Sequence, residues 1–330
     1  MKKNIFKVAA LVALCMMLAF CTSAFAAEEK FPSRMINLIF PQAAGGAVEQ
    51  AARIWQPYVE KELGVPLNFE FFTGAGSLVG YNVMLERARD GYNIGVFAPA
   101  SMANVILTMN AKFKVEDFDY IGIPFMDPGI LFAYKDAPWN NLQELVDYAK
   151  TQPRESISVA VAAIGDVNIL GLRQLEDELD IKFNIVPFNG GGKARTALAG
   201  NQVPLGIFMY YGSSPIWDNT KVLAINVKST NIPELKDAQT FNQVAGKTLD
   251  DVFSSNGMML PGGVKEQHPD RYQFLVDAFT RAFQNPELIA QLEKMEQKDW
   301  LAPIMGDDCL KYTQEQFEYF KRNLNYLKGE

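Results

Sequence analysis

Short apolar runs alternate along this chain with amphipathic stretches, and turns rich in small residues separate them. The first apolar run lies at 36–40, and it is followed by a Gly-Gly turn and an amphipathic stretch at about 47–63. Brief apolar runs between turns are typical of buried strands, whereas apolar residues at helical spacing are typical of amphipathic helices. The pattern therefore predicts a strand, a small-residue turn and a helix that ends at Gly64.

The same unit recurs through the chain. Further strands are expected at 67–72, 93–97, 121–124, 129–134, 156–162, 183–188, 203–209 and 221–227. Helical patterns lie between most of them, and the chain from Pro269 onward is expected to be mostly helical, with a last helix at 314–327. Strands that alternate with helices predict an α/β fold with open sheets and flanking helices.

Four expected strands end in small-residue turns, at 45–46, 73–76, 163–166 and 189–192. Ligands of open α/β sheets bind outside the carboxyl ends of the strands. A glycine turn that opens a helix also presents free N–H groups and a positive dipole end, which suits an anion. Two domains facing each other would form a cleft with glycine turns on both sides, and the two crossover strands would act as a hinge.

The first residues have the pattern of a secretory signal peptide. Three lysines and an apolar run at 8–20 precede the small-residue triplet at 24–26, so the mature chain is expected to begin at Ala27. A lipoprotein anchored at Cys21 is the alternative, although the bulky residue before that cysteine argues against it. This pattern places the protein in the periplasm.

Composition excludes several classes of function. The formal net charge is −7 for the full chain and −10 without the three lysines of the first 26 residues, which argues against nucleic acid as a partner. His268 is the only histidine, so a catalytic triad or a histidine-rich metal site is excluded. Without the signal peptide only Cys309 remains, so no internal disulfide is possible. No metal and no cofactor are expected.

Other candidate residues have two interpretations each. Tyr210 and Tyr211 follow an expected strand and could line a pocket with rings and hydroxyls. Lys193 and Arg195 open a helix after three glycines, so they could reach an anion or face solvent. The glycines at 74–80 approach a dinucleotide-binding fingerprint, but the last gap is one residue too long.

Taken in order, several short motifs resemble the Bug-type solute receptors of tripartite tricarboxylate transporters. The motifs are Phe31-Pro-Ser-Arg34, Ile36-Asn-Leu-Ile-Phe-Pro-Gln-Ala-Ala-Gly-Gly46, Thr73-Gly-Ala-Gly-Ser77, Asp90-Gly-Tyr92, Leu142-Gln-Glu-Leu145, Tyr148-Ala-Lys150, Val186-Pro-Phe-Asn-Gly-Gly-Gly-Lys-Ala194, Leu198-Ala-Gly-Asn-Gln-Val203 and Leu260-Pro-Gly-Gly-Val264. The resemblance covers essentially all of the chain after the signal peptide.

The resemblance implies a type II-like periplasmic binding protein of two hinged α/β domains, each an open mixed sheet with flanking helices. Residues 27–124 with 229–330 would form the first domain, and 125–228 the second. Such a receptor is a monomer that closes on a small carboxylate and delivers it to a tripartite tricarboxylate-type membrane transporter. It is not an enzyme and needs no cofactor.

The resemblance also implies a ligand-binding set. Backbone N–H groups of the first glycine turn would hold the carboxylate, and turns of the second domain would complete the site. The expected ligand-binding residues are Gln42, Ala44, Gly45, Gly46, Thr73, Gly76, Ser101, Gly165, Asp166, Asn168, Asn189, Gly190, Gly191, Tyr210 and Tyr211.

Departures from the family pattern narrow the expected ligand. Glu49 stands where the family usually has Asp, and residues 162–166 replace the usual hydroxyl donors with apolar groups and a carboxylate. Because Asp166 would repel a second ligand carboxylate, a monocarboxylate with an apolar, aromatic or amino part is favoured over citrate. Two other functions stay open: a sensory receptor that feeds a histidine kinase, and a periplasmic enzyme that uses Asp166 or Glu49 as a base.

Overall fold

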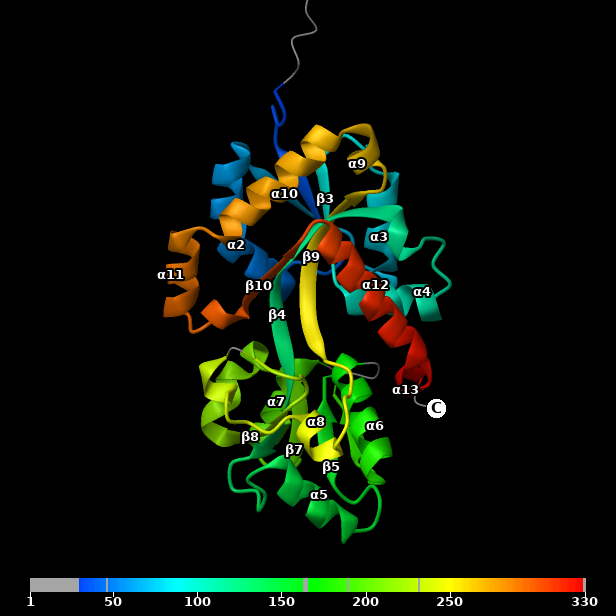
Figure 1. Ribbon diagram of the computed structural model, residues 1–330, viewed down its shortest axis with the longest axis vertical. Helices are drawn as coiled ribbons and strands as arrows, with labels where there is room; N and C mark the ends of the chain where they lie inside the picture. Colours follow the sequence, from blue (N-terminus) through cyan, green and yellow to red (C-terminus); the bar gives the residue numbers. More distant parts are fainter. Residues whose placement is uncertain (1–29, 46, 163–165, 189, 231, 329–330) are drawn as a thin grey trace, which may run out of the picture.

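The computed structural model describes residues 30–45, 47–162, 166–188, 190–230 and 232–328. The expected signal peptide and Cys21 lie outside these residues, as do the expected site residues Gly46, Gly165 and Asn189. Figure 1 shows two lobes, one above the other, with the long strands β4 (Phe118–Tyr134) and β9 (Phe253–Pro261) running between them.

The first lobe, at the top of Figure 1, is built mainly from the two ends of the chain. Its elements besides the crossing strands are β1 (Ile36–Phe40), α2 (Ala47–Leu63), β2 (Leu67–Phe71), α3 (Leu78–Glu86), β3 (Asn93–Phe97), α4 (Pro99–Thr108), α9 (Val264–Gln267), α10 (Pro269–Phe283), α11 (Pro286–Lys294), β10 (Leu301–Met305), α12 (Asp307–Arg322) and α13 (Leu324–Lys328). Short 3₁₀ turns occur at Ala75–Ser77 (η1), Val115–Asp117 (η2) and Lys298–Trp300 (η5).

The second lobe contains the middle of the chain. Its elements are α5 (Leu142–Lys150), β5 (Ser158–Val161), α6 (Val167–Leu179), β6 (Asn184–Pro187), α7 (Gly191–Ala199), β7 (Leu205–Met209), η3 (Tyr211–Asn219), β8 (Thr220–Ile225), η4 (Pro233–Leu235) and α8 (Phe241–Ala245). The strand order through both lobes is β2-β1-β3-β9-β4-β7-β5-β6, and β8 and β10 also pair with β4. The α/β fold with mixed sheets is therefore confirmed.

The first strand, turn and helix form as their pattern predicts. β1 is almost wholly buried, and Trp55 and Val59 of α2 are at most 3% exposed. The ring of Trp55 packs edge-on against Phe279 and Phe283 of α10, with ring centroids 5.8 Å and 6.2 Å away. The N- and C-terminal parts of the chain thus share one hydrophobic core in the first lobe.

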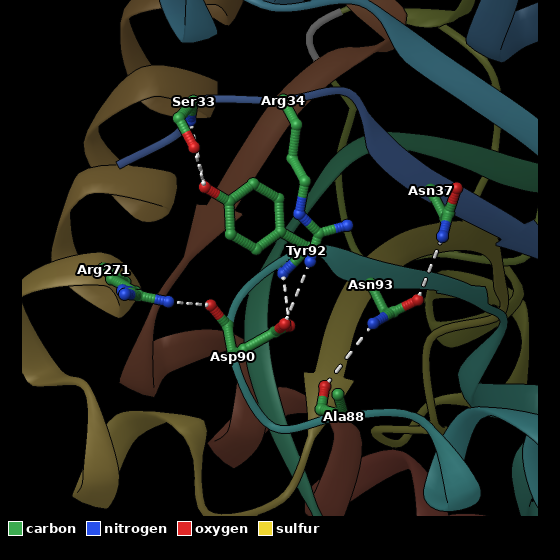
Figure 2. A network of polar contacts seen from close by, with 8 residues as sticks. All are labelled: Ser33, Arg34, Asn37, Ala88, Asp90, Tyr92, Asn93 and Arg271. Atoms are coloured by element: carbon green, nitrogen blue, oxygen red, sulfur yellow. Dashed lines mark hydrogen bonds and ion pairs between the residues drawn. The ribbon is translucent and has the colours of Figure 1, made fainter. Parts of the chain in front are cut away.

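Polar contacts fix the tight turn that precedes β3 (Figure 2). Asp90 accepts a hydrogen bond from the N–H of Tyr92 at 3.0 Å and pairs with Arg34 at 3.2 Å. Arg271 of α10 donates to the Asp90 carbonyl oxygen at 2.8 Å, and the Ser33 N–H donates to the Tyr92 hydroxyl at 2.9 Å. These contacts join the turn at 90–92 to residues 33–34 before β1 and to α10.

The long crossing strands differ from the sequence prediction. Two separate strands were expected at 121–124 and 129–134, but β4 is continuous over both and includes Pro124 and Pro128. Proline removes a ladder hydrogen bond, and it is tolerated here because the pairing of β4 with β9 already shifts register between Gly122 and Phe125. β9 and β10 were not expected, because their sequences carry few β-branched residues and form strands through pairing with β4.

Gly257 lies where β9 passes closest to its neighbours. A Cβ there would lie 2.7 Å from the Gly122 carbonyl oxygen and 2.6 Å from the Phe97 ring. We expect Gly257→Ala to lower the free energy of unfolding by about 1–3 kcal/mol, because the extra methyl overpacks a tight site. Gly192→Ala is the control, since nothing lies within 4 Å of its Cβ position. Equal denaturation midpoints for the two variants would contradict this prediction.

Candidate functional site

The turns of the two lobes face each other across the junction. β4 runs from the first lobe into the second; β9 is antiparallel to β4, and β3 is antiparallel to β9. β1 and β2 follow the direction of β3, so these strands end toward the second lobe. β7 is antiparallel to β4, and β5 and β6 follow β7, so these strands end toward the first lobe (Figure 1). This edge is where open α/β sheets bind ligands.

The first glycine turn already holds a carboxylate, which belongs to the chain itself. The Gly45 N–H donates to Glu49 Oε2 at 2.7 Å, and Arg53 pairs with the other oxygen of Glu49 at 2.9 Å. The Gly45 hydrogen bond and Arg53 lower the pKa of Glu49, so the group is charged at neutral pH. The left-handed φ of +80° at Gly45 aims this N–H at the carboxylate. Glu49 therefore caps the turn.

Two other expected residues flank this turn. Ala44 is exposed, and Gln42 is partly buried. The amide oxygen of Gln42 is buried and has no hydrogen-bond partner among the described residues. A buried polar atom without a partner is costly, so a water molecule or a ligand donor beside Gln42 would stabilise this turn.

The second turn of the first lobe brings Gly76 and Ser101 together. The Ser101 hydroxyl of α4 donates to the Gly76 carbonyl oxygen at 3.0 Å. Ala75 and Ser77 on either side have positive φ values of 44° and 88°, which cost energy in residues with a Cβ. Thr73 precedes this strained segment and is exposed. The structure thus places Thr73 and Gly76 after β2 and Ser101 after β3, on the two sides of β1.

In the second lobe, the carboxylate of Asp166 is directed at its own turn. It accepts hydrogen bonds from the Ala162 N–H at 3.2 Å and from the N–H and side-chain amide of Asn168 at 3.0 Å and 2.9 Å. Burial raises the pKa of Asp166, and these hydrogen bonds oppose the increase. Asp166 is therefore the N-cap of α6.

Asn168 lies beneath this turn, against the crossing strand. It is only 2% exposed, and its side-chain oxygen would be 2.6 Å from a Cβ on Gly129 of β4. This contact requires glycine at position 129. Asn168 thus connects α6 to the crossing strand, and its described contacts are with that strand and Asp166.

The turn before α7 lies beside the end of β5. Gly190, at φ +109°, donates its N–H to the Ala162 carbonyl oxygen at 3.0 Å. Arg195, one turn into α7, extends back over Gly191, so that its Nη1 would lie 3.0 Å from a Cβ there. The turn therefore carries a guanidinium over its glycines.

Tyr210 and Tyr211 lie at the end of β7 in an aromatic cluster. Tyr210 is 4% exposed and stacks on Trp217 with ring centroids 4.9 Å apart. Tyr211 is 7% exposed, and its ring is 5.7 Å from Trp300 of η5. Burial raises the pKa of Tyr210 to about 12. Both rings are therefore packed among neighbouring aromatic side chains.

Asp127 of β4 is a site residue that the sequence reasoning missed. It is 6% exposed and accepts a hydrogen bond from the Tyr211 N–H at 3.1 Å. Burial raises the pKa of Asp127 to about 7, while backbone N–H groups and the charge of Arg195 oppose the increase. An acidic residue inside the apolar run at 118–134 was the available signal.

The raised pKa of Asp127 predicts a pH effect on stability. Its folded-state pKa of about 7 exceeds the ordinary value of 3.8, so its stabilising contribution is complete below pH 3.8 and is lost as pH rises through about 7. We expect Asp127→Asn, which imitates the protonated form, to gain stability over the wild type between about pH 5 and 8. Urea unfolding across this range measures the difference, and a gap independent of pH would contradict the raised pKa.

The described residues contain no group of three or more metal-ligating side chains. Cys309 is fully buried, which raises its pKa to about 12.

In the part of the chain that the structure describes, no helix has the length and apolarity needed to cross a membrane. A cavity of about 500 Å³ beside α12 is lined by mixed charges and lies away from the turns.

Residues 51–326 match a protein family described as the tripartite tricarboxylate transporter family receptor. A UPF0065 protein from the TAR-I ttuE-ttuC' intergenic region of Agrobacterium vitis is 29% identical over 180 residues, which are 54% of this chain and 52% of the relative. The match thus spans about half the length of that relative.

Solved structures share the fold. A TctC solute binding protein from Polaromonas, solved without ligand, matches with a TM-score of 0.75 and 22% identity over 89% of this chain and 99% of that one. MatC from Rhodopseudomonas palustris, solved with bound malate, matches with a TM-score of 0.66 and 24% identity over 90% of this chain and 100% of that one. These similarities confirm the expected fold of a two-domain binding protein.

Proposed function

Because the chain belongs to the tripartite tricarboxylate transporter receptor family, we propose that it captures a small carboxylate between its lobes and delivers it to a membrane transporter of that class. The family consists of solute-binding receptors, which confirms both the expected resemblance and the expectation that this chain is not an enzyme. Members are periplasmic binding proteins, and residues 1–26 would be the signal peptide that directs this chain there.

The observation that carries the proposal is the carboxylate on the first glycine turn. Gly45 donates at 2.7 Å to Glu49, so the turn has the geometry that a carboxylate requires. A ligand carboxylate would displace Glu49 from Gly45 or bind the neighbouring N–H groups. Gln42, whose buried amide oxygen lacks a partner among the described residues, would accept a hydrogen bond from a bound water or from a hydroxyl or amino group of the ligand.

Closure of the lobes would complete the site. The two lobes would move as separate bodies, with β4 and β9 bending between them. Residues 229–330 were expected in the first domain, but η4 and α8 pack into the core of the second lobe and would move with it. Gly190, Gly191 and the edges of Tyr210 and Tyr211 would then approach the ligand. Closure excludes water and strengthens the remaining polar contacts. The receptor would act as a monomer.

The structure changes the expectation about ligand charge. The preference for a monocarboxylate depended on Asp166 repelling a second carboxylate, but Asp166 caps its own helix. We therefore propose a small mono- or dicarboxylate rather than citrate, since MatC, which shares the fold, was solved with the dicarboxylate malate.

A sensory receptor would bind the same ligand, and uptake of labelled ligand by cells with and without this protein distinguishes transport from sensing.

Calorimetric titration of residues 27–330 with small mono-, di- and tricarboxylates tests the proposal. A ligand that binds only the folded form stabilises it by about 2.7 kcal/mol at 100-fold over its dissociation constant, so melting temperature provides a second readout. We expect binding within the small carboxylates and no turnover of the ligand. Absence of binding, together with a native mass spectrum that shows no copurified acid, would contradict a carboxylate receptor.

A further inference from the structure

We propose that Arg195 binds the end of the ligand that faces the second lobe, so that this receptor prefers a ligand with an anionic group at both ends. This inference rests on the proposed function, and it assigns to one residue the preference for a dicarboxylate over a monocarboxylate of equal length. Arg195 would bind one end of the ligand, and the glycine turn of the first lobe would bind the other.

The position of the guanidinium supports this assignment. Its Nη1 would lie 3.0 Å from a Cβ on Gly191 and 3.7 Å from a Cβ on Gly212. Gly191 opens α7 after β6, and Gly212 lies in η3 just after β7. The guanidinium therefore lies between two strand ends that point toward the first lobe, and both neighbours are glycines that leave space beside it.

The surroundings leave the donors of Arg195 available. Within the described part of the chain, no carboxylate lies within 4.0 Å of its guanidinium, and no hydrogen bond from it is formed. The side chain is partly buried, and burial lowers its pKa while the charge of Asp127 opposes the decrease. A guanidinium that has lost part of its hydration gains from a planar carboxylate, which can accept two parallel hydrogen bonds.

The charge of Asp127 influences how strongly Arg195 attracts a ligand carboxylate. Its carboxylate is directed at the Tyr211 N–H, 3.1 Å away, so it acts on Arg195 through charge and without direct contact. Asp166 is the other nearby acid of this lobe, and its oxygens are engaged by Ala162 and Asn168. A ligand carboxylate near this turn could therefore pair with Arg195, while the carboxyl groups of Asp127 and Asp166 are engaged by backbone N–H groups.

The test compares acids of equal chain length. Succinate, glutarate and adipate are titrated calorimetrically into residues 27–330, alongside butyrate, pentanoate and hexanoate. The variants are Arg195→Gln, Arg195→Lys and the control Lys193→Gln, which removes the same charge from an exposed position on the same helix. Far-UV circular dichroism and melting temperature establish that each variant is folded.

We expect at least one dicarboxylate to bind the wild type about 10- to 100-fold more tightly than its matched monocarboxylate. Arg195→Gln should remove that preference, Arg195→Lys should retain part of it, and Lys193→Gln should leave it unchanged. Binding of monocarboxylates by the wild type, with no effect of Arg195→Gln on any acid, would overturn the role of Arg195 while leaving the receptor function intact. Absence of binding of every acid, together with a native mass spectrum that shows no copurified acid, would overturn both.

Discussion

Gly45→Asp is expected to weaken carboxylate binding by more than about 100-fold. The new carboxylate would stand where the ligand carboxylate docks, and two like charges about 4 Å apart repel by about 4 kcal/mol at an effective dielectric constant of 20. Nothing lies within 4 Å of the Cβ position, so the side chain fits without a clash. Calorimetry with the acids that bind the wild type measures the loss.

Gly64→Asp separates backbone strain from this charge effect. Gly45 precedes α2 and Gly64 follows it. The φ of Gly64 is +73°, compared with +80° at Gly45, and nothing lies within 4 Å of either Cβ position. Both variants therefore pay a similar conformational cost, of roughly 1–2 kcal/mol. Gly64→Asp should lower the melting temperature at least as much and leave affinity unchanged. Equal affinities for the two variants would remove the first glycine turn from the site.

Phe279→Ala is expected to lower the free energy of unfolding by about 3–5 kcal/mol, because it leaves a cavity in the core of the first lobe. Phe279 is 0% exposed and contacts the rings of Trp55 and Phe283 at 5.8 Å and 6.0 Å. Its position on α10 is remote from the turns, so ligand affinity should change little in the folded variant. Urea and thermal unfolding measure the stability.

Met295→Ala is the matched control for this change. Met295 follows α11 in the same lobe and is 40% exposed, so its truncation leaves no cavity and should shift stability by less than about 0.5 kcal/mol. If Phe279→Ala were as stable as Met295→Ala, α10 and α2 would not share the core described above.

Local patterns predicted the parts of the fold that local chemistry determines. The segment at 36–64 combines a short apolar run, a glycine turn and a helical apolar stripe, and each signal suffices by itself. The start of α5 is also fixed locally, because the Asn141 side chain accepts a hydrogen bond from the Glu144 N–H and caps the helix. β9 could not be predicted in this way, because Ser254, Ser255 and Asn256 resemble a loop and become strand by pairing with β4.

The sequence predicted where the candidate site lies, but it did not predict where the side chains of the site point. The turns lie at strand ends, as the pattern requires. Sequence spacing does not reveal that Asp166 folds back onto Ala162, or that Glu49 occupies the Gly45 N–H. Nor does it reveal that Asp127 lies near Arg195, since 68 positions separate them and only the crossing strand brings them together.

The position of Trp300 gives the protein an intrinsic optical reporter. Its indole stacks on Phe125 of the crossing strand β4 at 4.6 Å and faces Tyr211 of the second lobe at 5.7 Å, so it contacts both the crossing strand and the second lobe. Any rotation of one lobe against the other changes the polarity around this indole, and indole emission shifts with polarity. Trp55 and Trp139, which are buried within separate lobes, would give a constant background, and Trp217, which stacks on Tyr210 in the aromatic cluster, would add its emission to that of Trp300. Lobe movement can therefore be followed by the fluorescence of the unlabelled chain.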